Sequence, residues 1–255
     1  MASDPTMRLV QLLAGKVPMA LDEAMIRIAE SVDDRVDVER ELARLDELAA
    51  GVEDDTPEGV RSHLYDELGF RGDAETYYAP ANSLLPSVLD RRTGIPITLA
   101  VVAIEVARRV DVDLEGIAMP GHFLLRPTGE PSRFLDPFDG HGWIDAPSCQ
   151  ALFHRTVAGM PWDDRYLDLV SSPRNTLARV LNNLAGAYRR SGERDRLVLV
   201  LELLLLVPAD HQRIRRELGV LLGSLGRYEE GASILAASPD PADHRSATML
   251  RAQLN

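Results

Sequence analysis

The stretch of sequence that decides the fold reads RRTGIPITLAVVAIEVARRVDVDLEGIAMPGHFLL over residues 91–125 and RFLDPFDG over residues 133–140. Within it, Pro96 suits the first turn of a helix, because the N–H that proline lacks has no partner there. From Pro96 to Arg109 the apolar residues recur mostly at three- or four-residue spacing. That spacing predicts a helix with one buried face.

Short strands are predicted after this helix. The candidate strands are residues 114–119, 122–126, 134–137 and 142–145. The first two runs are apolar and are joined at Pro120-Gly121, a dipeptide typical of a tight turn. We therefore expect a small antiparallel sheet that carries His122 and Asp136 on neighbouring strands.

The N-terminal third predicts a layer of helices. Apolar residues recur at helical spacing in three segments, which are residues 21–31, 36–51 and 57–69. Thr56 precedes Pro57 and suits an N-cap, since its hydroxyl can accept a bond from a free N–H of the first turn. A further short helix is expected to end near Thr93-Gly94, with Asn82 or Ser83 as its cap.

The C-terminal part repeats with a spacing of 34 residues. The positions Leu184, Ala185, Tyr188, Gly192 and Leu201 correspond to Leu218, Gly219, Leu222, Gly226 and Leu235. This spacing is the period of the tetratricopeptide repeat, in which a helix, a glycine turn and a second helix form one unit. Units are expected at residues 173–207 and 208–237, with a closing helix at 241–254. Two units cannot bury their own apolar faces, so this tail should pack on the core.

Composition indicates a globular protein that is neither secreted nor embedded in a membrane. The 255 residues are 45% hydrophobic and 27% charged. A formal net charge of −12 disfavours nucleic acid as a partner, because phosphate backbones would be repelled. No apolar run approaches the roughly 18 residues of a membrane span, and the N-terminus lacks a signal peptide's features. We expect a cytoplasmic protein without a cofactor, and its single cysteine excludes a disulfide framework.

His122 and Asp136 form a candidate pair of a base and the group that orients it. An imidazole whose Nδ1–H bonds to a carboxylate is held in one tautomer, and the carboxylate stabilises its cation. A lone histidine beside a strand is commonly a core residue, but the nearby aspartate favours a functional pair. We expect roughly 2.6–3.2 Å between their heavy atoms.

The order of these residues resembles the transglutaminase-like superfamily. Its catalytic core passes from a cysteine at a helix N-terminus to a histidine and then an aspartate on adjacent strands. That helix begins Gly-x-Cys with a small residue four positions after the cysteine. Gly94, Pro96 and Ala100 fill the same frame here, so Pro96 occupies the position of the nucleophile. His122 in PGHFLL and Asp136 in FLDPFDG match the other two members.

A narrower resemblance is to the SirB family, in which a transglutaminase-like core carries a tetratricopeptide-like tail. The motifs that carry it are NSLLPSVLDRRTGIPITL, PGHFLLR and LDPFDG. The resemblance implies an α+β fold, with a helical N-terminal layer and a papain-like core with a small antiparallel sheet. We expect these parts within residues 1–171, and helical repeats packed on them over residues 172–255.

Proline has no nucleophilic atom, so an active enzyme would need another residue in that role. Thr98 lies two residues into the predicted helix, and its alternative role is to bond its own backbone. Cys149 follows Asp145-Ala-Pro-Ser, which predicts an N-cap and the first turn of a helix. A helix dipole could lower the pKa of this thiol. Its alternative role is that of a small buried hydrophobe.

A metal site is a further alternative at the same loop. His122, Asp136, Asp139 and His141 offer two imidazoles and two carboxylates, which are acceptable ligands for zinc or another divalent ion. Their spacing matches no metal motif, and Asp139-Gly140 is also typical of a hairpin turn.

These observations predict a non-catalytic or residual transglutaminase-like protein that binds a protein or peptide partner. The alternative is an active amide hydrolase or acyltransferase that uses Thr98 or Cys149 with His122 and Asp136. A metal-dependent hydrolase is the third hypothesis. Asn82 is a further candidate, because the resemblance places it close to the cleft, although its position equally suits a helix cap.

Overall fold

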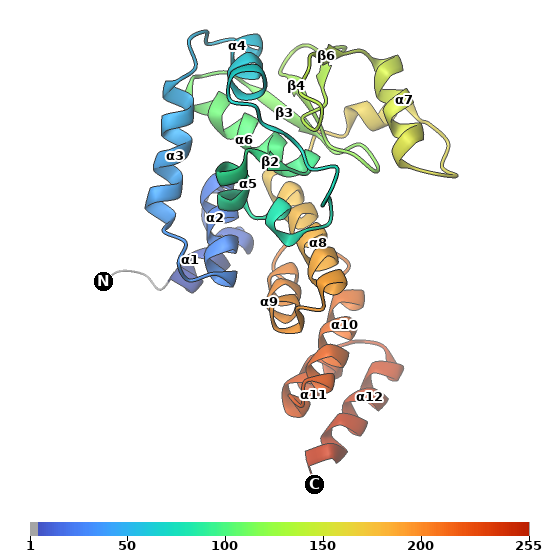
Figure 1. Cartoon of the computed structure of the whole chain (residues 1–255). Helices are drawn as coiled ribbons and strands as arrows, with labels where there is room; N and C mark the ends of the chain where they lie inside the picture. The colour runs from blue at the N-terminus through green and yellow to red at the C-terminus, as the bar shows by residue number, and fades with distance from the viewer. Residues whose placement is uncertain (1–4, 255) are drawn as a thin grey trace.

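The structure is a computed structural model that describes residues 5–254, with helices towards both ends of the chain and strands between them (Figure 1). The N-terminal helices are α1 (Pro5–Leu13), α2 (Leu21–Val32), α3 (Val38–Ala50) and α4 (Pro57–Arg61). Two more follow, α5 (Leu85–Arg91) and α6 (Pro96–Arg109), and α6 has the bounds that the sequence predicts. Thr56 caps α4 as expected, because its Oγ1 accepts a hydrogen bond from the N–H of Gly59.

The helix predicted over residues 57–69 changes its pitch after Arg61. A π-helical turn (Ser62–Glu67) follows α4, and the N–H of Leu68 donates to the carbonyl of His63, five residues earlier, at 3.0 Å. The three consecutive residues His63, Leu64 and Tyr65 are all buried in this wider turn. The expectation of one regular helix was therefore wrong for its second half.

The predicted antiparallel sheet is present, with shorter strands than expected. Its strands are β3 (Leu114–Ile117), β4 (Leu124–Pro127), β5 (Phe134–Leu135) and β6 (Trp143–Ile144), which are hydrogen-bonded in that order. His122 precedes β4 and Asp136 directly follows β5, so both lie just outside the strands. Leu125 pairs with Leu135 in antiparallel register, which brings the start of β4 to the end of β5.

A second, two-stranded sheet lies beside the loop that follows β5. Its parallel strands are β1 (Arg71–Gly72) and β2 (Thr93–Gly94). The N–H of Gly72 donates to the carbonyl of Phe138 at 2.9 Å. A Cβ atom at Gly72 would lie 2.4 Å from the Phe138 ring, so only glycine permits this approach. The contact fixes the loop that carries Asp136.

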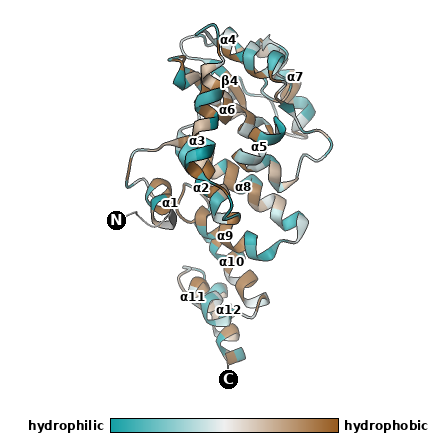
Figure 2. Ribbon diagram, turned by 60° about the vertical axis from the view of Figure 1, so that its left-hand side comes forward, coloured by the Kyte–Doolittle hydropathy of each residue, from teal (hydrophilic) through white to brown (hydrophobic). Residues whose placement is uncertain are grey.

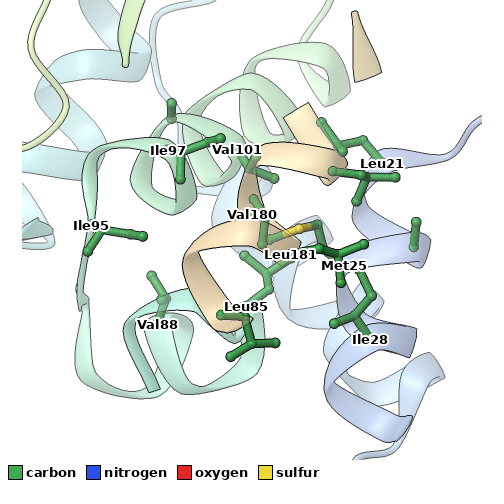
Figure 3. Close-up of a cluster of buried hydrophobic side chains, with 14 of the residues drawn as sticks. Leu21, Met25, Ile28, Leu85, Val88, Ile95, Ile97, Val101, Val180 and Leu181 are labelled. Carbon is green, nitrogen blue, oxygen red and sulfur yellow. The ribbon is translucent and has the colours of Figure 1, made fainter. Parts of the chain in front are cut away.

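One continuous core joins the N-terminal helices to α6 and to α8 (Pro173–Ser191). Figure 3 shows Met25 of α2, Leu85 of α5, Val101 of α6 and Leu181 of α8 within the same cluster. All four side chains are buried. The central helix α6 buries most of its surface, because other elements cover it on several sides.

The C-terminal helices lie close to the predicted segments. They are α7 (Ala146–Thr156), α8, α9 (Arg194–Leu204), α10 (His211–Ser224), α11 (Tyr228–Ala236) and α12 (Pro241–Arg251). Short 3-10 turns lie at Pro80–Ser83, Asp164–Asp168 and Ala252–Leu254. Figures 1 and 2 show α10, α11 and α12 extending away from the sheet, and the colours of Figure 2 show that these helices contain both hydrophobic and hydrophilic residues.

The apolar helix α9 is covered by its neighbours, as its sequence requires. Leu197, Val200, Leu201 and Leu204 are buried, whereas Glu202 is exposed. These leucines belong to the same core as α2 and α8, while α11 and α12 contribute a separate small cluster. Among residues 5–254, no helix combines the length and apolar character needed to cross a lipid bilayer.

Candidate functional site

His122 and Asp136 form the expected contact. The Nε2 atom of His122 lies 2.7 Å from Oδ1 of Asp136. The imidazole is 6% exposed, and the same Oδ1 also accepts the N–H of Phe138 at 2.9 Å. The distance agrees with the prediction, but the ring nitrogen differs, because Nε2 faces the carboxylate in place of Nδ1.

The orientation of the His122 ring decides which atom is left available for a ligand. In a neutral imidazole whose Nε2–H donates to a carboxylate, Nδ1 keeps its lone pair and is an acceptor. No side chain within residues 5–254 forms a hydrogen bond with this Nδ1. A ligand N–H or O–H can therefore bond it.

Arg179 of α8 holds the backbone beside His122. Its Nη2 donates to the carbonyl of His122 at 2.6 Å and to that of Met119 at 3.1 Å. The guanidinium also lies 5.5 Å from the centre of the Phe123 ring, within the range of a cation–π contact. Burial lowers the pKa of Arg179. The C-terminal helices thus contribute directly to the position of the imidazole.

A cavity of about 690 Å³ opens beside the His122–Asp136 pair. Its lining residues are Tyr77, Tyr78, Gly121, His122, Asp136, Phe138, Asp139, Leu152, Arg155 and Thr156. Cavities of this size accommodate small molecules or short segments of a chain. The aromatic and polar side chains in its wall make it the candidate functional site.

Asn82 supports the wall of this cavity through Tyr77, a lining residue whose carbonyl accepts a hydrogen bond from Asn82 Nδ2 at 3.3 Å. Its side chain is fully buried, and its Nδ2 donates to Asp73 Oδ2 at 3.0 Å and to the carbonyl of Thr76 at 2.8 Å. Its Oδ1 accepts a bond from Arg91 at 2.8 Å. The expectation that Asn82 or Ser83 caps the following helix was wrong, because both lie in a 3-10 turn and Leu84 precedes α5.

Asp73, which accepts a hydrogen bond from Asn82, should make the stability of the fold depend on pH. Burial raises the pKa of Asp73, but hydrogen bonds from Thr76 and Asn82 and the charge of Arg91 outweigh it, so the pKa lies below its usual value. Because the pKa of this carboxyl is lower in the folded protein than in the unfolded chain, its charged form stabilises the fold at pH values above the unfolded pKa of about 4. This stabilisation is lost as the pH falls through the pKa of the folded state. We expect Asp73→Asn to lower the free energy of unfolding at pH 7 by about 1–3 kcal/mol.

Urea unfolding of both proteins between pH 7 and pH 3 measures this effect. The difference between wild type and Asp73→Asn should shrink steadily as the pH falls below about 4. Asp113→Asn is the matched control, since Asp113 is exposed and should change stability little. A difference that stays constant over the whole range would contradict the assignment.

The start of α6 offers no nucleophile. Pro96 occupies the first turn of α6, as expected. Thr98 is fully buried, and its hydroxyl lies 2.7 Å from the carbonyl of Asn82 and 3.0 Å from that of Ile95. It also accepts the N–H of Ile95 at 3.2 Å. These bonds satisfy the hydroxyl within the backbone, and Thr98 does not line the cavity.

Cys149 is buried in a cluster of apolar side chains. The helix expected after Asp145 is present, and the Asp145 carboxylate accepts the N–H of Ser148 at 3.0 Å. The thiol has no exposed surface, and burial, followed by the charges of Asp145 and Asp136, raises its pKa to about 12. The lowered pKa considered for this thiol was therefore wrong, since desolvation exceeds the effect of the helix dipole.

The four candidate metal ligands do not gather into a site. His122 and Asp136 face each other, whereas Asp139 and His141 are both exposed. No group of three or more His, Cys, Asp or Glu side chains among residues 5–254 could hold a metal ion. The turn at Asp139-Gly140 instead bonds Asp136, whose carbonyl accepts both N–H groups.

Sequence patterns alone did not identify several residues at the cavity. Tyr77, Tyr78 and Phe138 line it, and Arg179 braces His122 from another part of the chain. The adjacent tyrosines before Pro80 were a visible signal, because aromatic pairs in loops are common at binding sites. No local signal distinguishes Arg179 from the other arginines.

Comparison with known proteins identifies the wider family. Residues 19–182 match the transglutaminase-like superfamily. A UPF0162 protein of Xylella fastidiosa is 36% identical over 177 residues, which cover 68% of this chain and 63% of that protein. A UPF0162 protein of Pseudomonas aeruginosa is 33% identical over 198 residues, covering 74% and 72% respectively.

A third relative has a different name and a smaller shared region. F-box only protein 21 of Homo sapiens is 34% identical over 139 residues, which cover 51% of this chain and 21% of that protein. No solved structure matches the chain. The match to the first Xylella protein spans less than two thirds of that protein's length. The chain belongs to the transglutaminase-like superfamily, and within it to the UPF0162 family.

Proposed function

We propose that the cavity beside His122 and Asp136 binds a peptide segment of a protein partner without cleaving it. The observation that carries this proposal is the fully buried state of Cys149, the only thiol in the chain. A thiolate nucleophile needs a lowered pKa and access to its substrate. Cys149 has a raised pKa and lies outside the cavity wall.

The lining of the cavity supports binding of a peptide. Tyr77 and Tyr78 are 36% and 59% exposed, so they offer aromatic surface at the cavity mouth. Aromatic side chains contribute much of the binding energy at protein interfaces. The Nδ1 acceptor of His122 and the guanidinium of Arg155 add polar groups that can orient a bound backbone.

In this proposal the C-terminal helices support the binding site. Their lengths and the 34-residue spacing support tetratricopeptide-like repeats over residues 172–255 that pack on a core of residues 1–171. Arg179 connects these helices to His122, so they act as a support for the site. A transglutaminase-like core with such a tail is the arrangement of the SirB family, so it supports this narrower assignment.

The alternative is an amide hydrolase or acyltransferase that uses Thr98 or Cys149. It requires a movement that exposes one of these buried side chains to the imidazole, because neither lines the cavity. A test of function must therefore measure binding and thiol reactivity together.

The experiment selects binders from a library of random twelve-residue peptides displayed on phage, using the full chain. Thr156→Trp narrows the cavity, because Thr156 lies in its wall. We expect this variant to weaken binding of the selected peptides at least about tenfold. The matched control is His154→Trp, since exposed His154 lies on the same helix but outside the lining.

The thiol supplies the second measurement. In the folded protein, Cys149 should react with iodoacetamide at pH 7 far more slowly than in urea, since burial and a pKa of about 12 suppress the thiolate. Selected peptides should remain intact by mass spectrometry. Rapid labelling, or cleavage that Cys149→Ser or Thr98→Val abolishes, would favour the enzyme instead.

A further inference from the structure

A continuous row of aromatic side chains leads from the His122–Asp136 pair to α8. The ring centres of His122 and Phe138 are 6.5 Å apart, those of Phe138 and Tyr77 are 5.9 Å apart, and those of Tyr77 and Tyr78 are 5.1 Å apart. The guanidinium of Arg190 then lies 4.0 Å from the centre of the Tyr78 ring. This aromatic row extends beyond the cavity described above.

A second cavity of about 210 Å³ lies along the far part of the aromatic row. Its lining residues are Tyr77, Tyr78, Ala79, Ser83, Ile95, Asn182, Asn183, Gly186, Ala187 and Arg190. Tyr77 and Tyr78 line both cavities, so the two spaces adjoin across these rings. The 3-10 turn Pro80–Ser83, which follows the tyrosines in the chain, packs beside α8.

The surface that α8 presents to the second cavity is polar and open. Asn182 and Asn183 are exposed, and an asparagine amide can both donate and accept hydrogen bonds. The Nδ2 of Asn182 already donates to the carbonyl of Ala178 at 2.8 Å, but it carries a second N–H. Gly186 lies inside the helix, although glycine costs about 1 kcal/mol relative to alanine there. A Cβ atom at Gly186 would meet only Nη1 of Arg190, at 3.4 Å, so no packing within the chain requires this glycine.

The arginines at the two cavities lack carboxylate partners. Most arginines of the chain pair with an aspartate or glutamate, as Arg189 does with Glu217. Arg155 in the first cavity and Arg190 in the second form no ion pair within residues 5–254, which is also true of exposed arginines elsewhere, such as Arg194, Arg213 and Arg245. The first cavity also carries the carboxylates of Asp136 and Asp139, whereas Arg190 is the one charged side chain that lines the second. The charge of the second cavity therefore suits an anionic group of a ligand.

We propose that the two cavities form one groove for an extended, acidic segment of a protein partner, with an Asp or Glu side chain of that segment bound by Arg190. This inference rests on the proposed function and names the class of partner. The amides of Asn182 and Asn183 bond the backbone of the segment, and the aromatic row packs against its side chains.

The dimensions of the groove favour an extended chain over a compact small molecule. An extended peptide advances about 3.3 Å per residue, so the aromatic row can follow at most about six residues. Arg190 recognises the acid through charge-assisted hydrogen bonds while its cation stays over the Tyr78 ring. The geometry therefore assigns the acidic residue to the end of the segment that lies on α8.

The test uses the peptides selected on the full chain, synthesised with amidated C-termini so that only side chains carry carboxylates. Fluorescence anisotropy of fluorescein-labelled peptides gives the dissociation constants. We expect the selected peptides to be enriched in Asp and Glu, and Arg190→Glu to weaken their binding at least about tenfold. Replacing the acid by its amide in the peptide should weaken wild-type binding similarly and remove the effect of Arg190→Glu.

Two further variants separate binding from folding. Gly186→Leu fills the second cavity and should weaken binding about tenfold or more without lowering the melting temperature, because leucine favours a helix. Arg245→Glu makes the same change of charge on α12, where Arg245 is exposed, and should leave binding unchanged.

The outcomes distinguish this inference from the proposed function. Peptides that Thr156→Trp weakens, but that show no acidic preference and no response to Arg190→Glu, would overturn the groove and keep the first cavity as a binding site. A selection that enriches no peptide would overturn both. Equal weakening by Arg190→Glu and Arg245→Glu would show only a general effect of charge, and would also overturn the groove.

Discussion

A chain that ends at Ser171 is expected to lose its cooperative unfolding transition and to accumulate as insoluble protein. The truncation removes Leu177, Val180, Leu181 and Leu184 of α8, all fully buried in the core that α2, α5 and α6 share. Each such side chain contributes about 1.5–3 kcal/mol when buried. Their combined loss is comparable with the roughly 5–15 kcal/mol that stabilises a typical domain.

Thermal melts of the truncated and full-length proteins measure this effect. A chain that ends at Leu225 is the control, because it keeps α8 to α10 and loses only α11 and α12, whose buried residues form a separate cluster. This shorter deletion should leave the main transition in place. A sharp transition near that of the full chain for residues 1–171 would show that the C-terminal helices are an independent module.

Gly140→Ala is expected to destabilise the protein by about 2–5 kcal/mol. Gly140 has φ of 74°, a region that residues with a side chain adopt at a cost. A Cβ atom there would also lie 2.3 Å from Cδ1 of Tyr65, which is buried. The N–H of Gly140 donates to the carbonyl of Asp136 at 2.8 Å, so the strain reaches the His122–Asp136 pair.

Gly129→Ala isolates the contribution of the contact with Tyr65. Gly129 also has a positive φ, of 86°, but a Cβ atom there would meet nothing within 4 Å. Its cost should be limited to about 1–2 kcal/mol of backbone strain. Urea unfolding of both variants gives the difference, and the imidazole signals of His122 in NMR spectra should move only for Gly140→Ala. Equal costs would contradict the steric explanation.

Local sequence signals predicted the elements whose structure depends on near neighbours. The bounds of α6 followed from Pro96 and from the spacing of its apolar residues. The strands were predicted too long, because their ends leave the sheet at the turns around Gly121 and Gly140. The helix α1 was not predicted, although Leu9, Leu12 and Leu13 recur at helical spacing and are buried.

Residues that depend on distant contacts were harder to predict. The pairing of His122 with Asp136 followed from motif spacing, but the choice of Nε2 depends on how the ring is placed between Asp136 and the cavity. Arg179 lies 57 residues from His122 along the chain, so no local pattern connects them. Cys149 follows a correct helix cap, yet burial in the folded protein determines its chemistry.

Because α8 is unbroken, the groove depends on the direction in which each residue of this one helix faces around the helix axis. Asn182 and Arg190 lie on one continuous helix, which leads into α9 to α12. Each residue of an α-helix turns the chain by about 100°. One inserted or deleted residue between these two positions would rotate Arg190 away from Tyr78 and reorient α9 to α12 together. Changes of length are therefore expected in the loops of this chain, while α8 keeps its residue count.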